Sequence, residues 1–266
     1  SASTTGRACV FAGFDFPIGL PAAYAARAGI SSFLDVLPTF GHRPWSDFYR
    51  VAERPEEITP RRPFYPMRPG GARQRHLTEG LDVLDMGSLL RRCERPTGER
   101  GAAAPLFWTL GGRQVGKAAI TGWREVLAPA LTDPRRDVAI WPFHGALAEL
   151  LDRHQITIAE VYPAEACVHV GLAPPGRGWS KRSQEDRRAR AGLLLEWAEP
   201  RGVELEGDLA RSIEDGFGPS ADEEDRFDAM LGVFSMIEVV GGHRPDGAPT
   251  DHVVRDVEGW ILGRSS

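Results

Sequence analysis

The sequence predicts an α/β fold in which helices cover a mainly parallel sheet. Short apolar runs typical of buried strands alternate along the chain with segments whose apolar residues recur at helical spacing. Strands that alternate with helices favour parallel pairing, because each connection crosses over the sheet. The chain has 266 residues, of which 42% are hydrophobic and 26% are charged. It can therefore bury a large core, and we expect a single domain over residues 1–266.

Four apolar segments are expected to form strands: residues 8–14, 106–110, 137–143 and 156–162. Residues 145–154 have leucines at helical spacing, so we expect a helix there. A second helix is expected to begin after Ser183, which would cap it, and to end at residues 200–202. Residues 38–76 are rich in Pro and Arg and give few signals for regular structure. We expect them to form an irregular insertion or lid.

The clearest helix begins near Asp222 and runs to about Val240. Ser220 and Glu223 have the spacing of a capping box, and the acidic first turn complements the positive end of the helix dipole. Asp225 and Asp228 stand three residues apart at the start of this helix, beside a strip of small residues. They could coordinate a divalent cation through oxygen, or they could form a solvated acidic turn.

Two further carboxylates follow predicted strands. Asp15 comes directly after the first strand, and Glu160 lies at the end of the fourth. The carboxyl ends of parallel strands meet at one edge of a sheet, where open α/β sheets usually place their sites. If Asp225 and Asp228 join them there, their mutual repulsion calls for Mg²⁺ or Mn²⁺. The simpler alternatives are a turn residue for Asp15 and an ion pair with an arginine for Glu160.

Several short motifs occur in a characteristic order. They are the Asp-x-Pro-x-Gly-Leu-Pro of residues 15–21, the Glu-x-Tyr-Pro of 160–163, the Asp-x-x-Asp-Ala of 225–229 and the Glu-Gly-Trp-Ile of 258–261, with weaker likeness at 114–116, 120–123 and 126–129. Over residues 8–264 the chain resembles an uncharacterised family of predicted RNase H-like nucleases. The resemblance implies an RNase H-like mixed sheet flanked by helices and metal-dependent hydrolysis of phosphodiester bonds. It also implies catalytic and metal-binding roles for Asp15, Glu160, Asp225 and Asp228.

The resembling family has a strand ending in a metal-binding Asp, and then a hairpin, before the Asp-x-Pro motif. Here that motif is already reached at Asp15. We therefore expect an incomplete sheet, because Pro17 and Pro21 prevent the segment after Asp15 from forming the hairpin. An unpaired edge is unfavourable, so an N-terminal fragment, another subunit or the chain's own insertion is expected to cover it.

Arginines gather in two places although the net charge is −5. Arg61 and Arg62 interleave with aromatic residues in the Pro-rich stretch, and Arg182 belongs to a second group at 177–190. Arginine beside exposed aromatics suits contacts with a nucleic-acid backbone and bases, so we expect a nucleic acid as partner. Solvated irregular loops would give the same pattern.

Residues 111–118 nearly form a P-loop. The glycines and Lys117 fit, but Ala118 stands where a P-loop has the Ser or Thr that holds Mg²⁺. A P-loop-like NTPase is therefore the least favoured reading, and Arg113 and Lys117 are instead candidates for contacting substrate phosphates.

The remaining features bound the class of protein. Cys9, Cys93 and Cys167 form no Cys-x-x-Cys pair, which is typical of reduced thiols in a cytoplasmic protein. No apolar run approaches the roughly 18 to 20 residues of a membrane span. The alternative to a nuclease is a non-catalytic module of the same fold that binds a nucleic acid or nucleotide without cutting it. Bound metal would separate the two.

Overall fold

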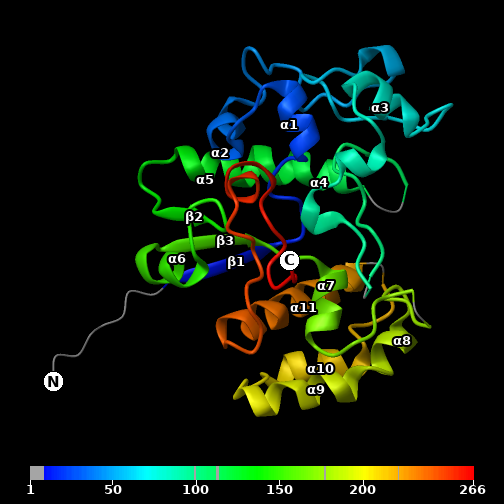
Figure 1. The fold of residues 1–266 in the computed structure, drawn as a ribbon. Helices are drawn as coiled ribbons and strands as arrows, with labels where there is room; N and C mark the ends of the chain where they lie inside the picture. The colour runs from blue at the N-terminus through cyan, green and yellow to red at the C-terminus, as the bar shows by residue number, and fades with distance from the viewer. Residues whose placement is uncertain (1–8, 99, 112–113, 177, 221) are drawn as a thin grey trace.

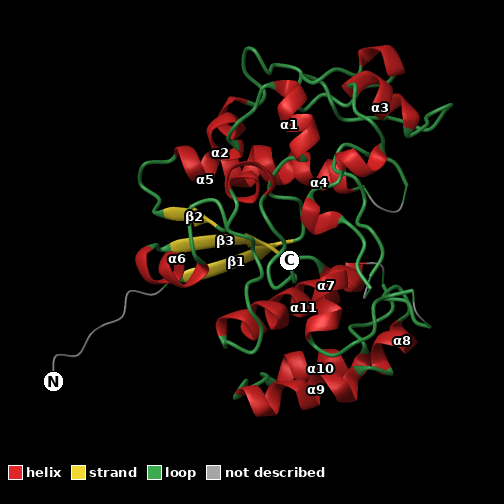
Figure 2. Cartoon of the chain, viewed as in Figure 1, coloured by secondary structure: helices red, strands yellow, loops and turns green. Residues whose placement is uncertain are grey.

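The structure is a computed structural model that describes residues 9–98, 100–111, 114–176, 178–220 and 222–266. Its sheet has three strands in the order β1-β3-β2, namely β1 (Val10–Phe14), β2 (Val138–Ile140) and β3 (Ile156–Glu160). Both pairings are parallel, and Phe14 of β1 stands opposite Glu160 of β3. The prediction that these two strands are parallel neighbours is confirmed (Figure 2).

Helices make up most of the regular structure. The described chain contains α1 (Ala22–Ala28), α2 (Phe33–Val36), α3 (Arg75–Leu81), α4 (Val115–Gly122), α5 (Ala128–Thr132), α6 (Leu147–Arg153), α7 (Pro163–His169), α8 (Gln184–Arg188), α9 (Ala191–Ala198), α10 (Gly207–Asp215) and α11 (Asp222–Val240). A π-helical turn, Trp123–Leu127, joins α4 to α5. The helix predicted after Ser183 is interrupted between α8 and α9, and the Ser183 side chain caps the first piece by accepting from the Asp186 N–H.

The sheet lies between two apolar layers, as an α/β fold requires. Successive strand residues point to opposite faces, so Ile158 packs into a core with α1 and α4, whereas Ala159 packs into a core with α6 and the C-terminal segment. Figure 1 shows α4 and α5 on one side of the sheet, α7 and α11 on the other, and α9 and α10 beyond α11. These layers confirm the α/β class.

Two expectations about strands are wrong. Residues 106–110 form no strand, because their only ladder contact is an isolated bridge between Tyr65 and Trp108. The second wrong expectation is that of a mixed sheet, since every strand pairing in the described ranges is parallel. Apolar character at 106–110 instead reflects burial of Leu106 and Phe107 in the core beside α1 and α4.

The segment 38–76 has little regular structure, as predicted, but it is built into the protein. Phe40 and Phe48 stack with ring centroids 3.5 Å apart, and Phe64 packs edge-on against Phe48. These rings are buried in the core that covers one face of the sheet. Aromatic packing therefore gives this segment its conformation in place of a hydrogen-bond ladder.

Helix α11 has the bounds that its acidic start and apolar run predict. Phe227, Leu231 and Phe234 pack against α9 and α10, and Met236 packs toward the sheet. The helix is thus apolar on two sides, which is typical of a buried helix. Val233, however, is 53% exposed.

None of the helices in the described ranges is long and apolar enough to cross a membrane.

Candidate functional site

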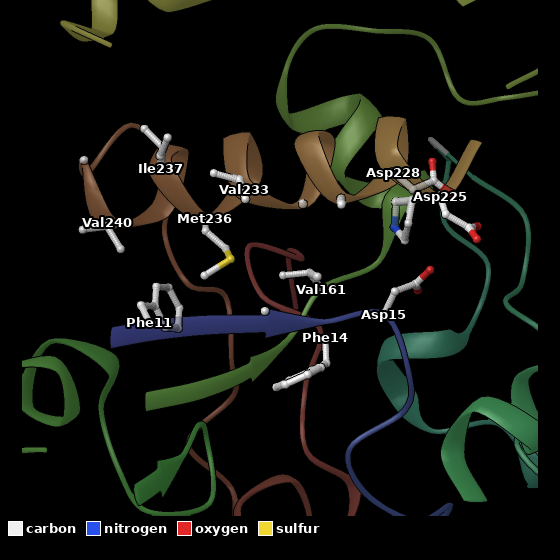
Figure 3. A pocket seen from close by; sticks show the side chains of 15 residues that line it. Phe11, Phe14, Asp15, Val161, Asp225, Asp228, Val233, Met236, Ile237 and Val240 are labelled. Carbon is white, nitrogen blue, oxygen red and sulfur yellow. The ribbon is translucent and has the colours of Figure 1, made fainter. Parts of the chain in front are cut away.

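Three carboxylates meet at one end of a groove between β1 and α11. Asp15 follows β1 directly, and Asp225 and Asp228 lie in the first turns of α11. All three line a hollow of about 820 Å³, which we call the β1–α11 groove; its other walls are mostly apolar. Figure 3 shows Asp15 pointing from the end of β1 toward Asp225 and Asp228. Glu160, which was expected to join these three carboxylates, does not line this groove.

The environment of Asp15 disfavours its negative charge. The Asp15 side chain is exposed to solvent where the groove adjoins a second hollow. Reduced hydration, followed by the negative charge of Asp228, raises the pKa of Asp15 to about 7. Lys181 opposes this shift, while Glu160 and Asp225 add to it. Such a perturbed carboxyl in a hollow is typical of functional sites.

Asp228 is only partly satisfied. Its Oδ2 accepts from the Lys181 ammonium, and both side chains are largely buried. Burial nevertheless raises the pKa of Asp228, because Lys181 offsets only part of the lost hydration. Its Oδ1 is buried without a hydrogen-bond partner among the described residues. A buried carboxylate oxygen left in this way favours a cation or donor in the groove.

Glu160 is held in a different manner. Arg91 donates to both of its oxygens, Nη2 to Oε1 at 2.6 Å and Nη1 to Oε2 at 2.8 Å. The Ile18 N–H donates to Oε2 at 2.7 Å. Arg91 is fully buried and is also paired with Glu94. The carboxylate of Glu160 therefore ties β3 to the segment after β1, which is the ion-pair alternative that the sequence left open.

Arg91 was not identified from the sequence. Nothing in the sequence around Arg91 distinguishes it from the other arginines or indicates that it is buried. Only the arrangement of three distant segments shows that it lies against Glu160.

A second, more polar hollow adjoins the groove at Asp15 and Asp228. It measures about 470 Å³, and its walls also include Glu160, Lys181 and Glu224. The start of α4 forms part of its wall through Gln114, Val115 and Ala118. Asp15 and Asp228 thus line both hollows, one mostly apolar and one more polar.

Three backbone amides at the start of α4 already have hydrogen-bond acceptors. The N–H groups of Lys117 and Ala118 donate to the Gln114 carbonyl, and that of Gly116 donates weakly to the Trp108 carbonyl at 3.4 Å. Amides already used in this way are not available to cradle a phosphate.

The predicted substrate-binding cations are dispersed. Arg61 lies over the Trp45 ring, and Arg62 pairs with Glu57; neither lines the two hollows that contain Asp15. Arg182 is exposed and pairs with Glu224 at the edge of the polar hollow. Lys117 is exposed at the start of α4, and Arg113 lies outside the described residues. Lys181, which belongs to the basic group at 177–190, donates to Asp228.

No group of three or more His, Cys, Asp or Glu side chains in the described ranges is placed to hold a metal. Asp15 and Asp228 line both hollows, and Glu160 lines the polar one. The metal-binding role expected for Asp15, Glu160, Asp225 and Asp228 therefore stays a prediction.

A second cluster resembles a catalytic triad in composition only. Ser235 Oγ lies 2.6 Å from His169 Nδ1, and Glu165 lies on the other side of the ring. All three side chains are at least nine-tenths buried, and Glu165 is engaged by Arg100 at 2.6 Å. No substrate could reach the hydroxyl, so the cluster fixes α7 against α11.

The chain matches no protein-family model, no curated protein and no solved structure.

Proposed function

We propose that the protein is an RNase H-like, metal-dependent nuclease that hydrolyses phosphodiester bonds of a nucleic acid at Asp15, Asp225 and Asp228. The observation that carries the proposal is the convergence of these carboxylates at the end of β1, with the pKa of Asp15 raised to about 7. Carboxylates that repel one another bind a divalent cation readily, because the cation removes the repulsion. The resemblance to RNase H-like nucleases supplies the class of reaction.

The roles of individual residues follow from their contacts. Asp15 and Asp228 would hold Mg²⁺ or Mn²⁺, and Asp225 would bind through water or orient the ion. When bound, the ion supplies a more acidic water and stabilises charge on the phosphate. Glu160 would act as a positioning residue, because Arg91 and Ile18 already occupy its oxygens.

Substrate phosphate would approach from the polar hollow. Lys181 already lies beside Asp228, and Arg182 follows it at the rim. A phosphate there would exchange the Lys181–Asp228 ion pair for a Lys181–phosphate contact and leave Asp228 to the metal ion. Lys117 could contribute only near the start of α4.

Cleavage of fluorescent single- and double-stranded DNA and RNA at pH 8 with Mg²⁺ or Mn²⁺ tests the proposal. We expect activity that EDTA removes and that Asp228→Asn lowers by at least about 100-fold, as loss of a transition-state contact does. Asp222→Asn is the matched control, because Asp222 is exposed in the same helix and does not line either hollow. Equal activity in the two variants would show that cleavage occurs elsewhere.

The alternative is a binding module that does not cut. The pairing of Lys181 with Asp228 and of Arg91 with Glu160 favours it, because both leave fewer free carboxylates for a catalytic metal. Calorimetric titration with Mn²⁺ distinguishes the two. Nucleic-acid binding that falls steeply with salt, without Mn²⁺ binding or cleavage, would support the module and contradict the nuclease.

A further inference from the structure

Among the described residues, β1 pairs with β3 on one side and with no strand on its outer edge. Alternate residues of β1 face β3: the Val10 N–H donates to the Gln155 carbonyl, and the Phe14 carbonyl accepts from the Val161 N–H. The N–H and C=O groups of Phe11 and Gly13 therefore point away from the sheet. Within the described ranges they have no hydrogen-bond partner.

An apolar wall stands beside this edge. Helix α11 touches β1 closely at Gly13, where an added Cβ would lie 2.6 Å from the Met236 sulfur. Farther around the helix, Val233 and Val240 line the β1–α11 groove but are 53% and 56% exposed. Val10 on the strand is also 56% exposed. Exposed aliphatic side chains that line a hollow of about 820 Å³ are typical of an interaction site.

We propose that the β1–α11 groove takes an extended segment of another polypeptide, which pairs with β1 as an additional strand. A neighbouring strand would run about 4.8 Å from β1, beside the walls of the groove. Its backbone would satisfy Phe11 and Gly13, and alternate side chains would fill the space against Val233 and Val240. A purely apolar small molecule could fill the groove but could not satisfy the backbone groups of β1.

The charge of the groove indicates which charge the bound segment should carry. Its end at Asp15 carries three carboxylates, and among the described residues the one cation in direct contact with them is Lys181, on Asp228. A segment with a lysine or arginine beside Asp15 would be attracted, and an acidic one would be repelled.

Selection from a displayed library of random peptides of about eight residues, the length of a typical strand, tests the inference in metal-free buffer. We expect enrichment of sequences in which apolar residues alternate and a basic residue stands at one end. A synthetic copy of an enriched peptide should bind at least about tenfold more weakly when alternate backbone amides are N-methylated, because those amides can no longer pair with β1.

Two variants locate the binding site. Val233→Lys should weaken the peptide at least about tenfold, since it places a charge in the apolar wall. Leu193→Lys on α9 is the matched control, because Leu193 is 41% exposed and lies outside the groove, and it should leave binding unchanged. Circular dichroism should show that both variants remain folded.

Three results would overturn the inference: no enrichment, binding that survives both N-methylation and Val233→Lys, or concentration-dependent self-association that Val233→Lys abolishes. The last would identify a second copy as the occupant. The test uses neither metal nor nucleic acid, so its outcome does not depend on the proposed nuclease activity.

Discussion

Replacing Arg91 with Met tests whether Glu160 is held as a structural residue. The Arg91 guanidinium is fully buried and donates to Glu160, to Glu94, and to the carbonyls of Ile18 and Glu258. Methionine would fill much of the volume but would leave two carboxylates in the core without a cation. Removing one partner of a buried ion pair typically costs about 3–5 kcal/mol. We expect a loss of unfolding free energy in that range.

Urea unfolding followed by tryptophan fluorescence measures this loss. With a slope of about 2–3 kcal/mol/M, the midpoint should fall by about 1–2 M. The loss should shrink as the pH is lowered toward 4, because burial raises the pKa of Glu94, and its protonation discharges one of the carboxyls that Arg91 had neutralised. Arg50→Met is the matched control, since Arg50 pairs with Asp47 at 2.8 Å with both side chains at least half exposed, and it should cost less than about 1 kcal/mol.

A loss of less than about 1 kcal/mol for Arg91→Met would refute this reasoning. Glu160 would then be free to serve as a metal ligand, and its pairing with Arg91 would not be the reason for its burial. The double variant Arg91→Met with Glu160→Gln should lose less than the sum of the single variants, because the two residues share one interaction.

Three further predictions follow from single positions. The pKa of Asp15 is raised to about 7 in the folded protein, so the folded state binds more protons than the unfolded state between pH 4 and 7. The resulting contribution to the free energy of unfolding is present below pH 4 and is lost as the pH rises through 7. Asp15→Asn should therefore gain stability relative to the wild type on going from pH 4 to 8 in EDTA, as urea unfolding would show, and a constant difference would contradict the shift. Gly19→Ala should cost at least about 2 kcal/mol, because φ is 135° and an added Cβ would lie 2.1 Å from the Glu258 carbonyl oxygen; Gly29→Ala, at a φ of 71° with open space around it, should cost less in the same assay. Mg-ATP should not bind with micromolar affinity in calorimetry, and binding that Lys117→Ala removed would restore the P-loop interpretation.

Several elements could be predicted because their signals are local. The acidic first turn and the apolar run specify α11 between Asp222 and Val240, and alternating apolar segments specify β1 and β3. Asp15 follows β1, and Glu160 ends the neighbouring strand β3. Because the two strands are parallel, both residues lie at the same edge of the sheet. By contrast, the apolar character of residues 106–110 predicted a strand, because a buried irregular segment and a buried strand have the same composition.

The sequence by itself determined the α/β class, the acidic start of α11 and the carboxylates that could meet there. Only the tertiary structure decided how each carboxylate is used: Arg91 neutralises Glu160, Lys181 pairs with Asp228, and Asp15 faces the groove. It also decided that, among the described residues, no strand pairs with the outer edge of β1 beside the groove that Val233 lines. The physical reason is that helix and strand signals arise within a few neighbouring residues. Charge pairing and burial depend on which distant segments come into contact, and one sequence does not record that.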